Sequence, residues 1–361
     1  MSKEKCKFCE MEFITKRGYV WYPNGTWGKK GGLFLVFIGK EELLNIFKEI
    51  ERQLGRPIDK LITLAKRIVT INVVDEEFLG RFMRFLVRLR LVNGNMLKNT
   101  LNKKLTSSIG WGVCDEVKLN YKEKKASFKF RNYPSIALIE GAIGGIVQYM
   151  FRLESVKITS QKKDGTLETK IEPKDKESEL AKYIQNPAPA SKSEFLPGNI
   201  NYNLCPNCKV PKEFSDRYKW DMSGGKIIHK NTKKDYLLFT RYAIEAIFNL
   251  LIKELGDDIK DIILNAEKKY IKENLIFSSN NNTEDYRETL NVKEFGLKGW
   301  GNFVAVKKEN NNLVVHVDNP FNEIIIGGLI LGCYEAIENR EGNIKWKKEK
   351  ENSVIFKVLP K

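Results

Sequence analysis

The feature that most constrains the fold of this chain is an internal repeat, because a repeated sequence predicts a repeated structure. Three landmarks recur at an offset of 201 residues: Ile46-Phe47, Leu54-Gly55 and Ala65 match Ile247-Phe248, Leu255-Gly256 and Ala266. Later landmarks keep the same order at an offset of 189, where Gly110-Trp111-Gly112 matches Gly299-Trp300-Gly301. The 361 residues therefore predict two homologous modules, with an insertion in the first.

Cysteines and glycines extend the repeat beyond these landmarks. Each member of the first copy has a counterpart in the second: Cys6, Cys9, Gly141 and Gly145 match Cys205, Cys208, Gly328 and Gly332. The segment between the copies is rich in Lys, Glu, Ser and Pro and cannot build a core. We expect a first Cys-x-x-Cys knuckle over 1–29, a first module over 30–172, a linker over 173–200, and a second knuckle and module over 201–361.

Each module combines helical and strand-like patterns. Apolar residues at helical spacing predict two leading helices, the second ending near Val69 or Ile271. Gly55 and Gly256 are expected to end the first of these helices in a left-handed conformation. A hairpin, an apolar helix opened by a proline, and a closing hairpin follow. The pattern predicts an α+β fold in which helices pack on an antiparallel sheet, with the modules related by a pseudo-two-fold axis.

Composition favours an intracellular protein with an acidic partner. The longest apolar runs are half the length of a bilayer-spanning helix or shorter, and the first residues carry charges where an export signal needs an apolar core. We therefore expect a cytoplasmic location. The formal net charge of +16 suggests nucleic acid, an anionic membrane surface or an acidic protein as partner, although a Lys-rich genome composition would also produce it.

The two Cys-x-x-Cys pairs predict a metal site. Two thiolates at this spacing reach one tetrahedral ion, and structural Zn²⁺ takes four ligands. If the modules pack about a pseudo-two-fold axis, Cys6, Cys9, Cys205 and Cys208 meet and complete one zinc site that ties the modules together. Zinc or an iron-sulfur centre completed by another chain, and redox-active or metal-free thiols, are the alternatives.

Gly-Trp-Gly before a hairpin, an Asn-Pro or Tyr-Pro turn, a glycine-rich helix and a closing hairpin together resemble the 4-vinyl-reductase domain, a predicted hydrocarbon-binding module. That family is similar in fold to the lipid-tunnel subunits of the TRAPP tethering complex. The resemblance covers about 30–172 and 210–361 and implies that a small hydrophobic ligand binds in a cavity beneath the helices. The cysteine and glutamate zinc site of aromatic-sensing members has no counterpart, since the closing hairpins contain no cysteine.

Two groups of residues are candidates for binding. The ligand-cavity candidates are residues whose small or flat side chains leave room or form a wall: Trp111, Gly141, Gly145, Trp300, Gly328 and Gly332. Close helix packing and a packed turn are the alternative interpretations. Arg81, Arg84 and Arg88 fall on one helical face and are candidates for an anion-binding surface, or for an ordinary solvated face.

The function that these features favour is non-enzymatic binding of a small hydrophobic ligand, as a sensor or carrier. The two histidines have no counterparts in the other copy, which disfavours a hydrolase triad, so no catalytic residue is predicted. Three alternatives remain: a TRAPP-like scaffold for a protein partner, a basic regulator associated with nucleic acid, and an accessory enzyme of tetrapyrrole or hydrocarbon metabolism.

Overall fold

The computed structural model describes residues 6–11, 18–29, 33–74, 80–174, 195–275, 286, 290, 292–309 and 311–361. The first copy contains β1 (Tyr19–Trp21), β2 (Trp27–Lys29), β3 (Leu35–Gly39), α1 (Lys40–Leu54), α2 (Asp59–Val73), α3 (Gly80–Arg88), α4 (Gly94–Lys104), β4 (Val113–Asn120), β5 (Lys125–Arg131), α5 (Ile136–Phe151), β6 (Val156–Lys163) and β7 (Thr166–Pro173). The second copy contains α7 (Lys212–Arg217), β8 (Tyr218–Asp221), β9 (Lys226–His229), β10 (Asp235–Thr240), α8 (Arg241–Leu255), α9 (Ile259–Leu275), α11 (Val292–Lys298), β11 (Asn302–Glu309), β12 (Asn312–Asp318), α12 (Glu323–Glu338), β13 (Gly342–Lys350) and β14 (Ser353–Pro360).

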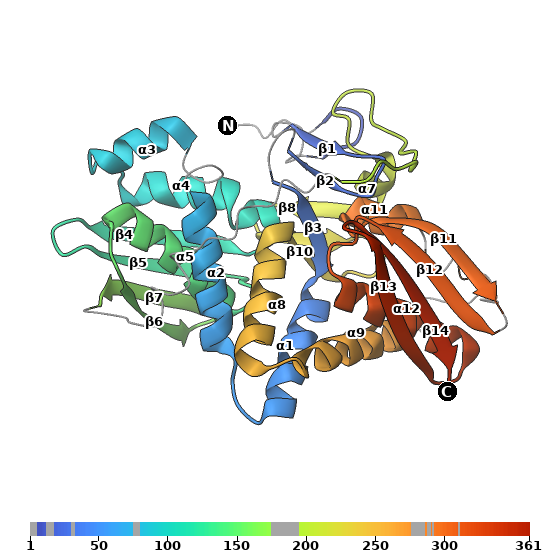
Figure 1. Cartoon of the computed structure of the whole chain (residues 1–361). Helices are drawn as coiled ribbons and strands as arrows, with labels where there is room; N and C mark the ends of the chain where they lie inside the picture. The colour runs from blue at the N-terminus through green and yellow to red at the C-terminus, as the bar shows by residue number, and fades with distance from the viewer. Residues whose placement is uncertain are drawn as a thin grey trace.

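The predicted α+β architecture is confirmed, and the two copies share one topology. The outer sheets have the equivalent strand orders β4-β5-β7-β6 and β11-β12-β14-β13, and every pairing in them is antiparallel. Helices α5 and α12 pack on these sheets and on α2 and α9, respectively. Figure 1 shows the two sheets at opposite ends of the molecule, with α1, α2, α8 and α9 between them.

A pseudo-two-fold axis passes through the centre of the molecule. Strands β3 and β10 pair antiparallel in a register that sets Phe37 opposite Leu238, its own counterpart at the offset of 201. The rings of Phe47 and Phe248, which are also counterparts, lie 6.3 Å apart where α1 meets α8. Equivalent residues contact each other only on the axis of a two-fold pair, so the copies are arranged like the subunits of a dimer.

Close helix packing explains the repeated glycines. A Cβ atom on Gly141 would lie 2.6 Å from the Thr63 carbonyl oxygen, and one on Gly328 would lie 2.6 Å from the Leu264 carbonyl oxygen. Thr63 and Leu264 are themselves counterparts. Gly145 and Gly332 likewise abut the backbone of α2 and α9. The four glycines therefore allow two helix pairs to touch, and none of them is among the lining residues of the two cavities described below.

Several local expectations are wrong. Strands β3 and β10 precede the leading helices, which the helical pattern alone does not indicate. Pro134 and Pro320 lie before the N-cap residues Ser135 and Asn322, whose side chains accept the first amide hydrogen bonds, so neither proline is in a first turn. Gly256 has φ 101° and ψ 168°, which is not the left-handed cap that Gly55 adopts with φ 63°.

Two apolar clusters stabilise the molecule. The larger one is continuous from the first outer sheet, through α1, α2, α8 and α9, to the second outer sheet. The smaller one is rich in aromatic side chains, among them Trp21, Trp27, Phe37 and Phe214, and lies between the central strands and the N-terminal knuckles. The modules therefore share one core. Within the described part of the chain, no helix has both the length and the apolar character needed to cross a membrane.

Candidate metal centre and ligand cavity

The four cysteines of the two knuckles come together. The Sγ atoms of Cys6, Cys9, Cys205 and Cys208 all lie within 4.8 Å of one another. Counterparts face each other, with 3.7 Å between the sulfurs of Cys6 and Cys205 and 3.3 Å between those of Cys9 and Cys208. The axis that relates the central strands therefore also relates the two knuckles, as the repeat predicted.

Each knuckle is a tight turn that directs both thiols to one point. The amide of Glu10 donates to the Cys6 carbonyl oxygen, and the amide of Lys209 donates to that of Cys205. Glu10 and Lys209 are left-handed, with φ of 56° and 61°. Burial raises the pKa of Cys6, but hydrogen bonds from the Phe8 backbone and from Asn207 outweigh it and lower that pKa to about 6.

The sulfur–sulfur distance between Cys6 and Cys205 fits a tetrahedral metal ion, whereas the 3.3 Å between Cys9 and Cys208 is shorter than the tetrahedral value. A Zn–S bond of about 2.3 Å implies about 3.8 Å between sulfurs at the corners of a tetrahedron, close to the 3.7 Å between Cys6 and Cys205. Cys6 and Cys205 are buried and Cys9 and Cys208 are half-buried. Four thiols at such spacing could hold one metal ion, and they would fill all four positions of a tetrahedron.

A cavity of about 250 Å³ lies where the first module meets the central strands. Its walls come from α2, the end of α4, α5 and strand β10 of the second copy, and include Val69, Ile109, Trp111, Ile146 and Phe239. The lining contains Lys29, Lys66 and Lys104 but no carboxylate. The cavity is therefore mainly apolar with a basic character.

Lys66 is the most unusual group in this cavity. The residue is 6% exposed, and its Nζ atom lies 4.9 Å from the centre of the Trp111 ring. Burial lowers the pKa of Lys66 to about 8, and no acidic neighbour in the described part of the chain offsets this. A buried cation is normally paired, so Lys66 is available to an anionic group inside the cavity.

Trp111 offers a second polar group beside Lys66. Its Nε1 atom is buried and has no hydrogen-bond partner among the described residues. In the second copy, Nε1 of Trp300 donates to the Phe37 carbonyl oxygen at 2.9 Å. Buried indole N–H groups usually find an acceptor. Trp111 thus lies in the wall of this cavity, whereas the donor of Trp300 is satisfied within the protein.

In the second copy, the cation near the equivalent tryptophan is neutralised by carboxylates of the protein itself. Position 66 is matched by Glu267, which is fully buried, and burial together with nearby Glu42 raises the pKa of its carboxyl. The cation over Trp300 is Lys298, whose Nζ lies 5.7 Å from the ring centre and 3.3 Å from Glu294. Burial opposes the charge of Lys298, but Tyr236 and Glu294 raise its pKa. Among the described residues, no carboxylate lies in the lining around Lys66 or offsets its charge.

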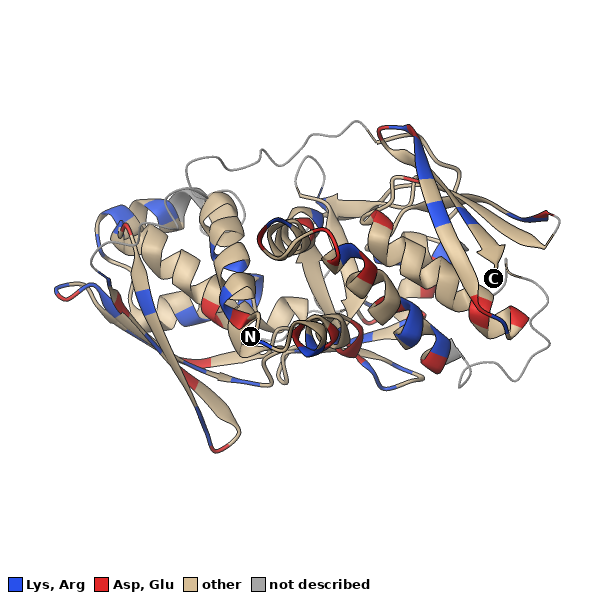
Figure 2. Cartoon of the chain, turned by 60° about the horizontal axis from the view of Figure 1, so that its bottom comes forward, with Lys and Arg blue, Asp and Glu red and all other residues tan. Residues whose placement is uncertain are grey.

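The charge excess is spread over both modules, and one part of it surrounds a second cavity. Figure 2 shows Lys and Arg interspersed with Asp and Glu along the helices and strands of both halves. Arg84 and Arg88 of α3 line a separate cavity with other basic residues. Arg81 is also in α3, but its side chain lies outside the described residues.

Comparisons with protein-family models, with curated proteins and with solved structures find no match for this chain. The fold and the site define its class: a duplicated α+β protein in which four cysteines from two N-terminal knuckles form a candidate metal centre on the pseudo-two-fold axis.

Proposed function

We propose that this protein binds a small, mainly apolar molecule with an anionic headgroup, in the cavity bounded by α2, α5 and β10. The observation that carries the proposal is the buried ammonium of Lys66 in a mainly apolar lining, with no carboxylate partner among the described residues. Pockets that bind drug-sized ligands measure about 300 to 1,000 Å³, so a cavity of about 250 Å³ suits a smaller molecule.

The arrangement of polar groups supports an acid as the ligand. Lys66 Nζ offers charged donors and Trp111 Nε1 offers a neutral one. A carboxylate could accept from both while its hydrocarbon part contacts Val69, Ile146 and Phe239. The resemblance to the 4-vinyl-reductase domain supports a small hydrophobic ligand, without indicating its headgroup, and a sensor or carrier is the role that such binding serves.

We also propose that the ion held by Cys6, Cys9, Cys205 and Cys208 is Zn²⁺ and that its role is structural. Four thiolates favour zinc or iron-sulfur chemistry, and a closed tetrahedral site leaves no open position for a substrate. Metal analysis of protein purified without added metal should give one zinc per chain. Cys9→Ser should lower this ratio, whereas Cys114→Ser, at a buried cysteine outside the site, should not.

Calorimetric titration with octanoate and with octanol tests the ligand proposal, because the two differ in the headgroup and share the hydrocarbon tail. The wild-type protein should bind octanoate at least tenfold more tightly than octanol. Lys66→Met should remove this preference and leave octanol binding intact, since the cavity stays apolar. Lys60→Met, on the exposed face of the same helix, is the matched control.

Equal affinity for octanoate and octanol, or an unchanged preference in Lys66→Met, would contradict the proposed role of Lys66. Absence of binding to either probe, together with no small molecule released from the purified protein by organic extraction, would contradict ligand binding in this cavity. If Lys60→Met has the same free energy of unfolding as the wild-type protein, loss of a lysine on α2 does not by itself disturb the fold.

A further inference from the structure

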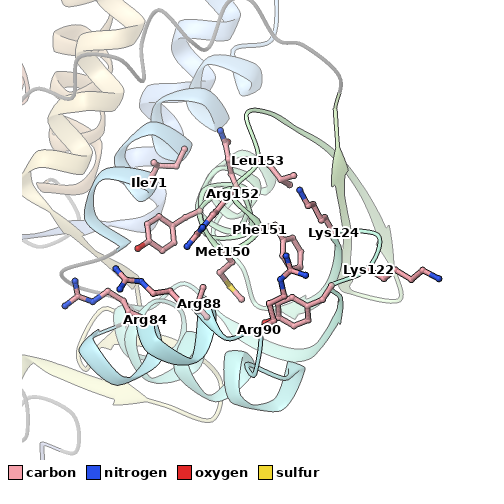
Figure 3. Close-up of a pocket in the computed structure, with 14 residues that line it drawn as sticks. Ile71, Arg84, Arg88, Arg90, Lys122, Lys124, Met150, Phe151, Arg152 and Leu153 are labelled. Atoms are coloured by element: carbon pink, nitrogen blue, oxygen red, sulfur yellow. The ribbon is translucent and has the colours of Figure 1, made fainter.

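A second and larger cavity, of about 710 Å³, lies at the corner where α3, the turn between β4 and β5, and the end of α5 meet. Figure 3 shows Arg84 and Arg88 on α3, Arg152 at the end of α5, and Lys122 and Lys124 on the turn around this space. The volume falls in the usual range of small-molecule sites, about 300 to 1,000 Å³.

The lining is strongly basic. Six of its side chains are cationic and none is acidic: Arg84, Arg88, Arg90, Lys122, Lys124 and Arg152. The one carboxylate on the turn, Glu123, pairs with Lys125 at 2.9 Å. Like charges gathered in a concave space repel one another and concentrate the potential there. The cavity therefore favours an occupant with several negative charges.

The pseudo-symmetry provides an internal comparison for this corner. Phe151 and Arg152 at the end of α5 correspond to Glu338 and Asn339 at the end of α12. Glu338 accepts hydrogen bonds from Lys308 at 2.7 Å and from Arg340 at 3.4 Å. The second copy thus neutralises its basic residues with a protein carboxylate.

The first copy has no such carboxylate in its place. Arg88, Arg90 and Arg152 make no ion pair in the described part of the chain, and a phenylalanine stands where Glu338 does in the second copy. Helix C-termini attract cations, which accounts for a single arginine at the end of α3 or α5. It does not account for six cationic residues from three elements contributing to the lining of one cavity.

The rest of the lining is apolar and aromatic. Tyr121, Tyr149, Met150, Phe151 and Leu153 contribute to the cavity beside the cations. The Tyr121 hydroxyl donates to the Val92 carbonyl oxygen at 2.8 Å, which fixes its ring. Phe151 contacts that ring edge-on, with 5.3 Å between centres. Such a surface suits the hydrocarbon or aromatic part of an organic anion.

We propose that this cavity binds a small organic phosphate or diphosphate, with the phosphate groups held by Arg88, Arg90 and Arg152 and the carbon part held against Phe151 and its neighbours. One guanidinium group can donate two parallel hydrogen bonds to two oxygens of a phosphate, so arginine is well suited to bind phosphate groups. The concave, partly apolar shape favours a single molecule over a duplex or a bilayer, which would contact a broad basic surface.

Binding of inorganic pyrophosphate and of geranyl diphosphate to the full chain tests the proposal. Geranyl diphosphate should bind at least tenfold more tightly than pyrophosphate, because the apolar lining contributes. Arg88→Ala and Arg152→Asn should each weaken both ligands about tenfold. Asn339 keeps a left-handed cap at the equivalent position, with φ 48°, so Arg152→Asn should preserve the fold. Arg56→Ala, at an exposed arginine that is not among the lining residues, should change binding less than twofold.

Two further probes separate the sources of the phosphate group. Phosphatidic acid vesicles and duplex DNA should bind more weakly than geranyl diphosphate, and neither should depend on Arg152. Tight binding of vesicles or DNA without binding of either soluble diphosphate would overturn the proposal. Unchanged diphosphate affinity in a folded Arg88→Ala, Arg152→Asn double variant would overturn it as well. Lys66→Met should leave diphosphate binding intact, so this site and the Lys66 cavity are tested independently.

Discussion

Lys66 and Glu267 show how one substitution after duplication gives equivalent positions different chemistry. Both residues are buried on the second helix of their copy, against Gly141 and Gly328, respectively. The signal was present in the sequence, because Lys66 falls between Ile62 and Val69 on the apolar face of its helix. It was missed because a lone lysine in an amphipathic pattern is usually assigned to the helix border.

The pKa of Lys66 makes the stability of the protein depend on pH. Its folded value of about 8 lies below the ordinary 10.5, so the charge is destabilising below pH 8 and this destabilisation fades as pH rises to 10.5. Lys66→Met should raise the free energy of unfolding by up to about 3 kcal/mol at pH 7 and by about 1 kcal/mol at pH 10. Urea unfolding at both pH values measures this.

Octanoate should bind less tightly to the wild-type protein as pH rises through 8, because the anion favours protonated Lys66, whereas octanol affinity should stay constant. A stability gain in Lys66→Met that does not change with pH would show that the ammonium is hydrated and that its burial has no energetic consequence.

The two tryptophans form a matched pair for a hydrogen-bond test. Trp300 donates to the Phe37 carbonyl oxygen, and Trp111 has no acceptor in the described structure. Trp300→Phe should therefore destabilise the protein by about 1 kcal/mol more than Trp111→Phe. Thermal unfolding of both variants gives this difference, and equal losses would mean that the indole hydrogen bond contributes nothing.

At the scale of elements, the glycines of α12 set the distance between α12 and α9, because they let the two backbones come close together. Gly328→Ala would place a methyl group 2.6 Å from the Leu264 carbonyl oxygen and should destabilise the protein by about 1 to 3 kcal/mol. Gly327 is the control, because a Cβ there would meet its nearest atom at 3.5 Å. Gly327→Ala should be neutral or stabilising by up to about 1 kcal/mol, since alanine favours the helix. A similar melting temperature for both variants would contradict this account.

The sequence predicted the outer hairpins and the leading helices well, and it missed the central strands β3 and β10. Apolar residues at every second position, such as Ala126, Phe128 and Phe130, indicate a strand with one buried face. All four hairpins of the outer sheets were predicted in this way. Strands β3 and β10 carry continuous apolar runs, and their partner lies in the other copy. Periodicity cannot reveal such a pairing, because both faces of the strands are buried.

At the scale of the whole molecule, the repeat predicted the meeting of the four cysteines but not the asymmetry of the cavities. The cysteines meet because counterparts on a two-fold axis face each other. Both cavities use first-copy residues, Lys66 in one and Arg152 in the other, at positions where the second copy has Glu267 and Asn339. A repeat fixes the common scaffold, whereas function depends on the positions at which the copies differ.

The symmetric arrangement also predicts what loss of the metal does. The knuckles adjoin only the smaller aromatic cluster, whereas the β3–β10 ladder and the larger core join the modules independently of the cysteines. Removing the ion should therefore loosen the knuckles, β1 and β2 without separating the modules, although the sequence suggested that the metal ties them together. Hydrogen exchange after chelation should speed up at residues 18–29 and 200–220 and stay slow in α1 and α8. Cys9→Ser should reproduce this pattern, and Cys333→Ser, at a buried cysteine in the larger core, should not. Uniformly faster exchange across both modules would mean that the metal centre holds the whole fold.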